Sequence, residues 1–138
     1  MNVQIPEDYR PSEDEPFMNS RQQEYFRAKL MKWRNEILVD ANQTILSLQE
    51  ETVKEPDIAD RASTESERAL ELRTRDRQRK LIGKIDSALR RIDEGQYGYC
   101  VDTGEPISLK RLEARPVATL SLEAQERHER REKNYRDD

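Results

Sequence analysis

One apolar stripe constrains the first half of the chain more than any other feature. From residue 26 to residue 48 an apolar side chain recurs every three or four positions, which is the spacing of one helix face. The stripe consists of Phe26, Leu30, Trp33, Ile37, Ala41, Ile45 and Leu48. A helix of this kind gains most of its stability by packing that face, so the sequence requires an element that covers it.

A second apolar stripe supplies that element. It consists of Ala62, Ala69, Leu72, Ile82, Ile85, Leu89 and Ile92. The segment Arg73–Lys80 interrupts it with almost nothing apolar. Two long helices joined by a short turn bury both stripes by folding back on each other. The predicted fold is all-α: a long antiparallel coiled-coil hairpin with a small C-terminal globular knob and a terminal helix.

Capping residues predict where the first helix begins. Asn19 with Gln22, or Ser20 with Gln23, pairs an N-cap side chain with an amide three residues later. Either pair could start the helix. Pro56 should end it or lie just beyond its end, because the residue before a proline disfavours helical geometry.

The second helix has two candidate starts. It begins either at Asp57 or at Thr64, where Glu67 supplies the return half of a capping box. It should end at about Glu94, before Gly95. The tip of the hairpin then lies near residues 52–62.

Three regions follow from these boundaries. Residues 1–18 form an N-terminal arm with several prolines, mobile unless it docks elsewhere. Residues 19–94 form the antiparallel coiled-coil stem, and residues 95–138 form the knob and the C-terminal helix. We expect Ser121 to cap that last helix, which runs toward Lys133.

Composition limits the core and the partners. With 33% hydrophobic and 39% charged residues, the 138-residue chain has room for one domain with a narrow core. The net charge is -4, with arginines interleaved among acids, which disfavours direct DNA binding. No apolar run approaches the length of a membrane span, and the first residues resemble no secretion signal. The single cysteine, Cys100, gives no reason to invoke an oxidising compartment, so a cytoplasmic location is expected.

Four short motifs carry a family resemblance. They are Asp57-Ile58-Ala59-Asp60-Arg61-Ala62, Glu71-Leu72-Arg73-Thr74-Arg75-Asp76-Arg77, Tyr97-Gly98-Tyr99-Cys100 and Arg111-Leu112-Glu113-Ala114-Arg115-Pro116. In this order and spacing the chain closely resembles the DksA/TraR family of bacterial transcription regulators, from about residue 18 onward. The resemblance implies a regulator that binds RNA polymerase in the stringent response.

The resemblance also assigns a role to the tip. Asp57, Asp60 and Ala62 match the family residues that enter the secondary channel of the polymerase, near its active centre. Acidic residues are also favoured at a helix start for purely structural reasons, and both roles can hold at once. The sequence shows no nucleophile with a partnering base, so we expect a regulator and not an enzyme. Its expected effect is altered initiation, including repression at ribosomal RNA promoters.

The family's effector is guanosine tetraphosphate (ppGpp), bound at the polymerase interface. The resemblance places Arg77, Leu81, Lys84 and Arg115 at that site, although ordinary solvated helix charge also explains Arg77 and Lys84. A further basic residue of the family is replaced by Gln125, which predicts a weaker or rearranged response.

The resemblance further implies four zinc ligands in the knob. Here Cys100 occupies the first ligand position, while Thr103, Ser121 and Ala124 occupy the others. Zinc binds thiolate, imidazole or carboxylate donors, and His128 alone does not complete such a set. We therefore expect no structural zinc, and a degenerate zinc-finger-like knob held by packing.

Three other functions stay open. A transcript-cleavage factor of the Gre kind also uses a helical hairpin with an acidic tip. A structural coiled coil or holdase is a second alternative, although the polar segment Arg73–Lys80 weakens a continuous seam. A degenerate zinc ribbon that binds nucleic acid is the third, and the acidic balance disfavours it. We expect a monomer whose partners are RNA polymerase and ppGpp, without sequence-specific DNA binding or membrane attachment.

Overall fold

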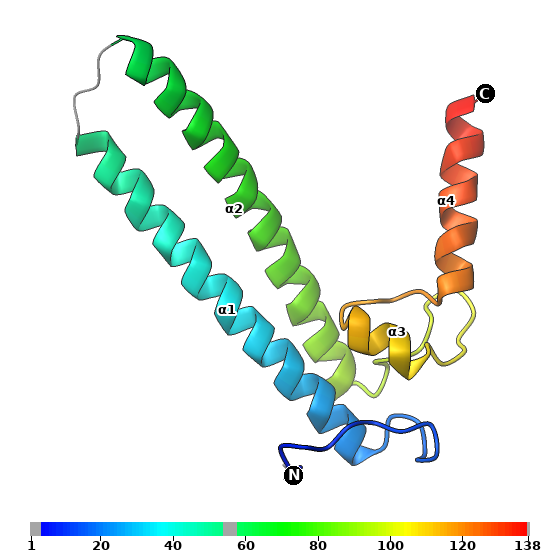
Figure 1. Cartoon of the computed structure of the whole chain (residues 1–138). Helices are drawn as coiled ribbons and strands as arrows, with labels where there is room; N and C mark the ends of the chain where they lie inside the picture. Colours follow the sequence, from blue (N-terminus) through cyan, green and yellow to red (C-terminus); the bar gives the residue numbers. More distant parts are fainter. Residues whose placement is uncertain (1–3, 54–57, 138) are drawn as a thin grey trace. The chain divides into compact units, whose positions relative to one another are not determined.

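The computed structural model describes residues 4–53 and 58–137, with side chains at 4–46 and 63–135. Four helices occupy these ranges: α1 (Ser20–Val53), α2 (Ile58–Asp93), α3 (Leu109–Ala114) and α4 (Leu122–Asp137). Within the described ranges the only β-type pairing is an isolated bridge between Tyr99 and Pro106. The all-α prediction is confirmed (Figure 1).

The start of α1 follows the first of the two predicted capping pairs. Asn19 Oδ1 accepts a hydrogen bond from the backbone N–H of Gln22 at 2.9 Å. The Gln22 side chain does not form the second hydrogen bond of a capping box with Asn19. It is fully buried, where its Oε1 accepts a hydrogen bond from the N–H of Met18 and its Nε2 donates to the carbonyl of Ser12. Gln22 therefore joins the cap of α1 to the N-terminal arm.

The start of α2 agrees with the earlier of its two candidate positions. The helix begins at Ile58, six residues before Thr64. It ends at Asp93, and Gly95 then adopts the left-handed conformation (φ 74°) that glycine tolerates best. The Gly95 N–H donates to the carbonyl of Ile92, which satisfies one of the last carbonyls of the helix.

The chain forms two compact units, and both long helices contribute to each of them. Unit 1 comprises residues 1–30 and 87–138, and unit 2 comprises residues 31–86. Unit 1 has a core of buried apolar side chains drawn from the arm, the four helices and the loops. They are Met18, Phe26, Leu30, Ala88, Ile92, Tyr97, Cys100, Ile107, Leu109, Leu112, Ala118 and Ala124.

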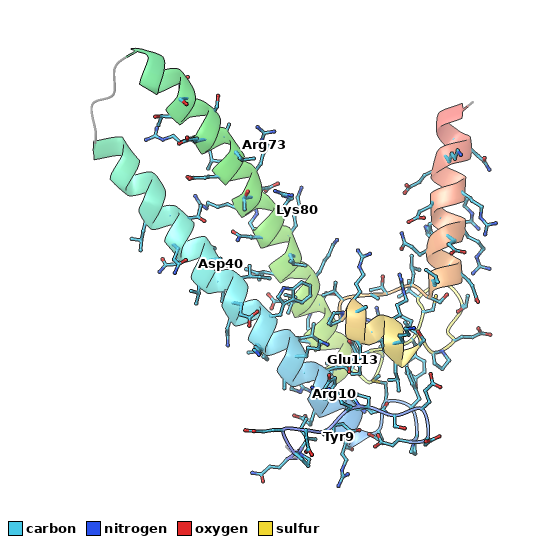
Figure 2. The ribbon with its side chains drawn as sticks, in the orientation of Figure 1. Tyr9, Arg10, Asp40, Arg73, Lys80 and Glu113 are labelled. Atoms are coloured by element: carbon cyan, nitrogen blue, oxygen red, sulfur yellow. The ribbon has the colours of Figure 1, made fainter. Side chains whose placement is uncertain are left out.

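The N-terminal arm is part of unit 1. The ring of Tyr9 packs edge-on against that of Tyr25, and the guanidinium of Arg10 lies 6.0 Å from the centroid of the Tyr25 ring. Phe17 packs against Tyr99 on the other side of the arm. Figure 2 shows Tyr9 and Arg10 beside the first turns of α1. These contacts dock the arm.

Unit 1 also joins α1 to α3 through one carboxylate. Glu113 Oε2 accepts a hydrogen bond from Tyr25 Oη at 2.9 Å and pairs with Lys29 Nζ at 2.6 Å. Lys29 Nζ donates to the Glu113 carbonyl as well. Burial and this carboxylate raise the pKa of Tyr25 to about 12. The aromatic hydroxyl therefore stays neutral and donating across the physiological range.

Within unit 2, α1 and α2 lie side by side and run in opposite directions (Figure 1). Arg34 Nε of α1 pairs with Asp86 Oδ1 of α2 at 2.7 Å. Ile37 and Ile85 are the buried apolar side chains of this unit among those that the structure describes. No helix in the described ranges is long and apolar enough to cross a membrane.

Candidate functional site

Of the residues assigned to the hairpin tip, those that the structure describes stand at the start of α2. Asp57 lies outside the described residues. Asp60 and Ala62 lie in the first turns of α2, where the structure describes the backbone and not the side chains. A carboxylate in the first turn of a helix is stabilised by the helix dipole.

Three of the residues assigned to the effector share one face of α2. Arg77, Leu81 and Lys84 are four and three residues apart, a spacing that brings side chains together on a helix. Arg77 and Lys84 are exposed, and Leu81 is partly buried. Neither basic side chain forms an ion pair with another described residue. This face of unit 2 therefore carries two cations and an apolar residue available to a ligand.

The fourth assigned residue belongs to unit 1. Arg115 is exposed and is the C-cap of α3, where its N–H donates to the Arg111 carbonyl at 2.7 Å.

The short helix α3 was not predicted, although local signals for it exist. Ser108 is its N-cap, with Oγ accepting from the N–H of Arg111, and Pro116 follows shortly after its last residue. Arg111 Nε donates to the Leu120 carbonyl at 2.8 Å, and Tyr97 Oη donates to the Pro116 carbonyl at 2.7 Å. These two bonds fix the loop between α3 and α4.

Cys100 lies in a pocket of hydrogen-bond donors. The residue is 2% exposed, and its sulfur accepts hydrogen bonds from the backbone N–H of Ser121, the Thr103 hydroxyl and the N–H groups of Thr103 and Asp102. Burial raises the pKa of the thiol, but these donors stabilise the thiolate more and lower the pKa to about 6. Two of the positions compared with zinc ligands, Thr103 and Ser121, thus contact the sulfur.

The remaining residues considered as ligands have other partners. Ala124 is fully buried, and its N–H donates to Ser121 Oγ, the predicted cap of α4. His128 Nε2 lies 2.7 Å from Asp102 Oδ2, so it has a carboxylate partner that the sequence did not indicate. Gln125 Nε2 donates to Glu129 on the same helix.

Comparison with known proteins decides the family. Residues 22–92 match the family model of the N-terminal domain of DnaK suppressor protein DksA. The chain belongs to the DksA family. Residues 95–130 match a second family model, described as the prokaryotic dksA/traR C4-type zinc finger.

Individual members of the DksA family resemble the chain along most of its length. The RNA polymerase-binding transcription factor DksA of Caulobacter vibrioides (strain NA1000 / CB15N) is 69% identical over 95% of this chain and 92% of its own. The protein of the same name from Escherichia coli (strain K12) is 42% identical over 92% of this chain and 84% of its own. The solved structure of transcription factor DksA2 from Pseudomonas aeruginosa has a TM-score of 0.79 and 44% identity, covering 85% of this chain and 90% of that one. DksA proteins are transcription factors, in agreement with the expectation of a non-enzyme.

The prediction of no structural zinc is wrong by this comparison, because residues 95–130 match a C4-type zinc-finger domain. The prediction rested on the residues at the four ligand positions, of which only Cys100 is a zinc donor, and the match of the whole segment to the zinc-finger family model overturns it. Around Cys100 the described residues supply one thiol, and no group of three or more His, Cys, Asp or Glu gathers in the described ranges. This donor set does not complete four strong zinc ligands.

Proposed function

We propose that this chain is a bacterial transcription regulator that binds RNA polymerase in its secondary channel and, together with ppGpp, modulates initiation, including that at ribosomal RNA promoters. The observation that carries the proposal is the 69% identity, over 95% of the chain, to a protein named RNA polymerase-binding transcription factor DksA. The family-model match to residues 22–92 supports it further, because it spans most of both long helices.

We propose that the acidic segment at the start of α2 is the part of the chain that acts on RNA polymerase. Asp57, Asp60 and Ala62 would lie near the active centre of the polymerase, where carboxylates can meet basic groups and a small side chain permits close approach. The effect is regulatory: tighter binding to one conformation of the promoter complex shifts the population toward it. The net charge of -4 supports action through the polymerase and not through direct contacts to DNA.

The residues proposed for the effector are taken from the family resemblance, each within its own unit. In unit 2 they are Arg77, Leu81 and Lys84, and in unit 1 it is Arg115; the three basic side chains are exposed and can pair with phosphate oxygens of ppGpp. Gln125 offers a neutral amide, already bonded to Glu129, where the family has a basic residue. We therefore expect ppGpp to enhance the effect less than in relatives that keep that charge. The proposed setting is the bacterial cytoplasm, and the proposed form is a monomer.

The first test is binding to purified RNA polymerase by competition with a fluorescent copy of the protein. Wild type and Asp60→Asn should compete equally, because the substitution removes one charge and keeps the side-chain shape. Only wild type should then alter initiation. Absence of binding by the wild type would overturn the proposal.

The effector site is tested by charge removal on α2. Arg77→Ala or Lys84→Ala should raise the ppGpp concentration needed for half-maximal effect by roughly tenfold or more, because each removes a charged donor to phosphate. The matched control is Arg79→Ala, which removes the same charge from an 81% exposed side chain on another face of α2. An equal loss in all three variants would show a general charge effect and contradict the assigned site.

A further inference from the structure

The packing between α1 and α2 changes along unit 2. Close to the Arg34–Asp86 ion pair, Ile37 and Ile85 are 7% and 0% exposed. Farther along the same helix pair, no described side chain of unit 2 is buried, and the facing residues Ala41 and Ile45 are only partly covered. The seam is therefore well packed at one end of unit 2 and loose beyond it.

A groove lies in the loose part. It has a volume of about 410 Å³ and is lined by Ala41, Ile45, Leu72, Arg75, Asp76, Gln78, Arg79 and Ile82. Its α2 side comes largely from the polar segment that interrupts the second apolar stripe, bounded by Arg73 and Lys80 in Figure 2. Because Ala41 is small and the facing segment of α2 is polar, the apolar residues Ile45, Leu72 and Ile82 line an open groove and are not buried.

Two side-chain atoms in this region are buried without a hydrogen-bond partner in the structure. They are Gln78 Oε1 and Glu71 Oε2. The two residues are seven positions apart, so they lie on the same face of α2. A buried acceptor without a donor favours any conformation in which it reaches water. We call Glu71 and Gln78 the polar break.

We propose that the polar break is a built-in weak point at which the helices of unit 2 separate locally in the free protein, while the pairing around Ile37 and Ile85 persists. A protein opens first where few apolar contacts and unsatisfied polar groups coincide, and both occur here. The part of the hairpin that precedes the tip would then be adjustable when it enters a binding site.

Hydrogen exchange of the full-length free protein tests the weak point. In wild type, amides of residues 70–78 should exchange at least roughly tenfold faster than those of residues 85–92, since local opening reports the local free energy. Gln78→Leu, which replaces the unpartnered amide by an apolar side chain of similar size, should slow exchange at 70–78 by about tenfold. Gln78→Met is the second variant, because its flexible side chain fits an irregular space.

The matched control is Gln43→Leu, the same change at an exposed position of α1 in unit 2. It should leave exchange at 70–78 unchanged. Equal protection of 70–78 and 85–92 in wild type would overturn the weak point. So would unchanged exchange in both Gln78 variants, or the same slowing in the control.

Discussion

Unit 1 and unit 2 use the same two long helices in different ways. Unit 1 gathers the arm, α3 and the loops around them and contains nearly all of the buried apolar side chains that the structure describes. Unit 2 has one seam, with Ile37 and Ile85 buried, and it leaves Leu38, Val39, Leu46, Leu70 and Leu72 exposed. The difference indicates that unit 1 supplies most of the stability, while unit 2 leaves much of its apolar surface exposed.

The largest effect should come from the core of unit 1. Leu112 is 0% exposed, so Leu112→Ala should lower the free energy of unfolding by about 2–5 kcal/mol. The same truncation in unit 2, Leu72→Ala, removes a side chain that is 52% exposed and should cost less than about 1 kcal/mol. Urea denaturation of the full-length proteins measures both. Equal losses would break the contrast between the units.

A single buried hydrogen bond gives the next largest effect. Tyr97→Phe removes the hydroxyl that donates to the Pro116 carbonyl and leaves that carbonyl without its donor, at a cost of about 1–3 kcal/mol. Tyr135→Phe is the control. Because Tyr135 is 87% exposed, removing its hydroxyl should not change the stability detectably. Thermal melting compares the two. A neutral Tyr97→Phe would mean that the loop before α4 is held by packing alone.

Acid should act on unit 1 through Glu113. Burial raises the pKa of this carboxyl, but hydrogen bonds from Lys29 and Tyr25 outweigh it, so the pKa lies below its usual value of 4.5. A carboxyl whose pKa is lower in the folded than in the unfolded protein stabilises the fold at any pH above the unfolded pKa. This stabilisation is lost as the pH falls through the folded-state pKa. Glu113→Gln should therefore lower the Tm at pH 7 by less than Tyr97→Phe does, and the difference from wild type should shrink as the pH is lowered below 4.5. A constant difference across this range would contradict the assigned pairing.

The smallest effect should come from the surface of unit 2. Asp86→Ala breaks the pair with Arg34, in which the two side chains are 45% and 30% exposed, and should cost less than about 1 kcal/mol. The loss should shrink further at high salt, since exposed ion pairs are screened. Urea denaturation at low and high salt measures it. A loss as large as that of Leu112→Ala would mean that this contact holds both helices together.

Periodic patterns made much of the fold predictable. The apolar stripes predicted the long helices that the structure shows as α1 and α2. Local capping chemistry offered Asn19 as one of two candidate N-caps of α1 and Ser121 as the N-cap of α4. Such signals depend only on residues that are close in the sequence, so the sequence alone reveals them. The helix α3 was missed because six residues are too few to show a period.

Contacts between distant segments were not predictable. Tyr25 and Glu113 are 88 positions apart in the sequence. The docking of the arm and the burial of Gln22 correspond to no periodic pattern in the sequence. The expectation of no zinc was wrong. It relied on the residues at single ligand positions, whereas the segment as a whole matches the zinc-finger domain. The roles of Asp57, Asp60, Ala62, Arg77, Leu81, Lys84 and Arg115 come from family resemblance and stay predictions.

The central claim is that the start of α2 acts on RNA polymerase while the rest of the chain holds and positions it. The most direct measurement is in vitro initiation from a ribosomal RNA promoter with purified polymerase, comparing wild type with Asp60→Asn, each with and without ppGpp. Both proteins should bind polymerase and melt at the same temperature. Wild type should repress initiation, more strongly with ppGpp, and Asp60→Asn should not. Equal repression by the two proteins, or none by the wild type, would contradict the account.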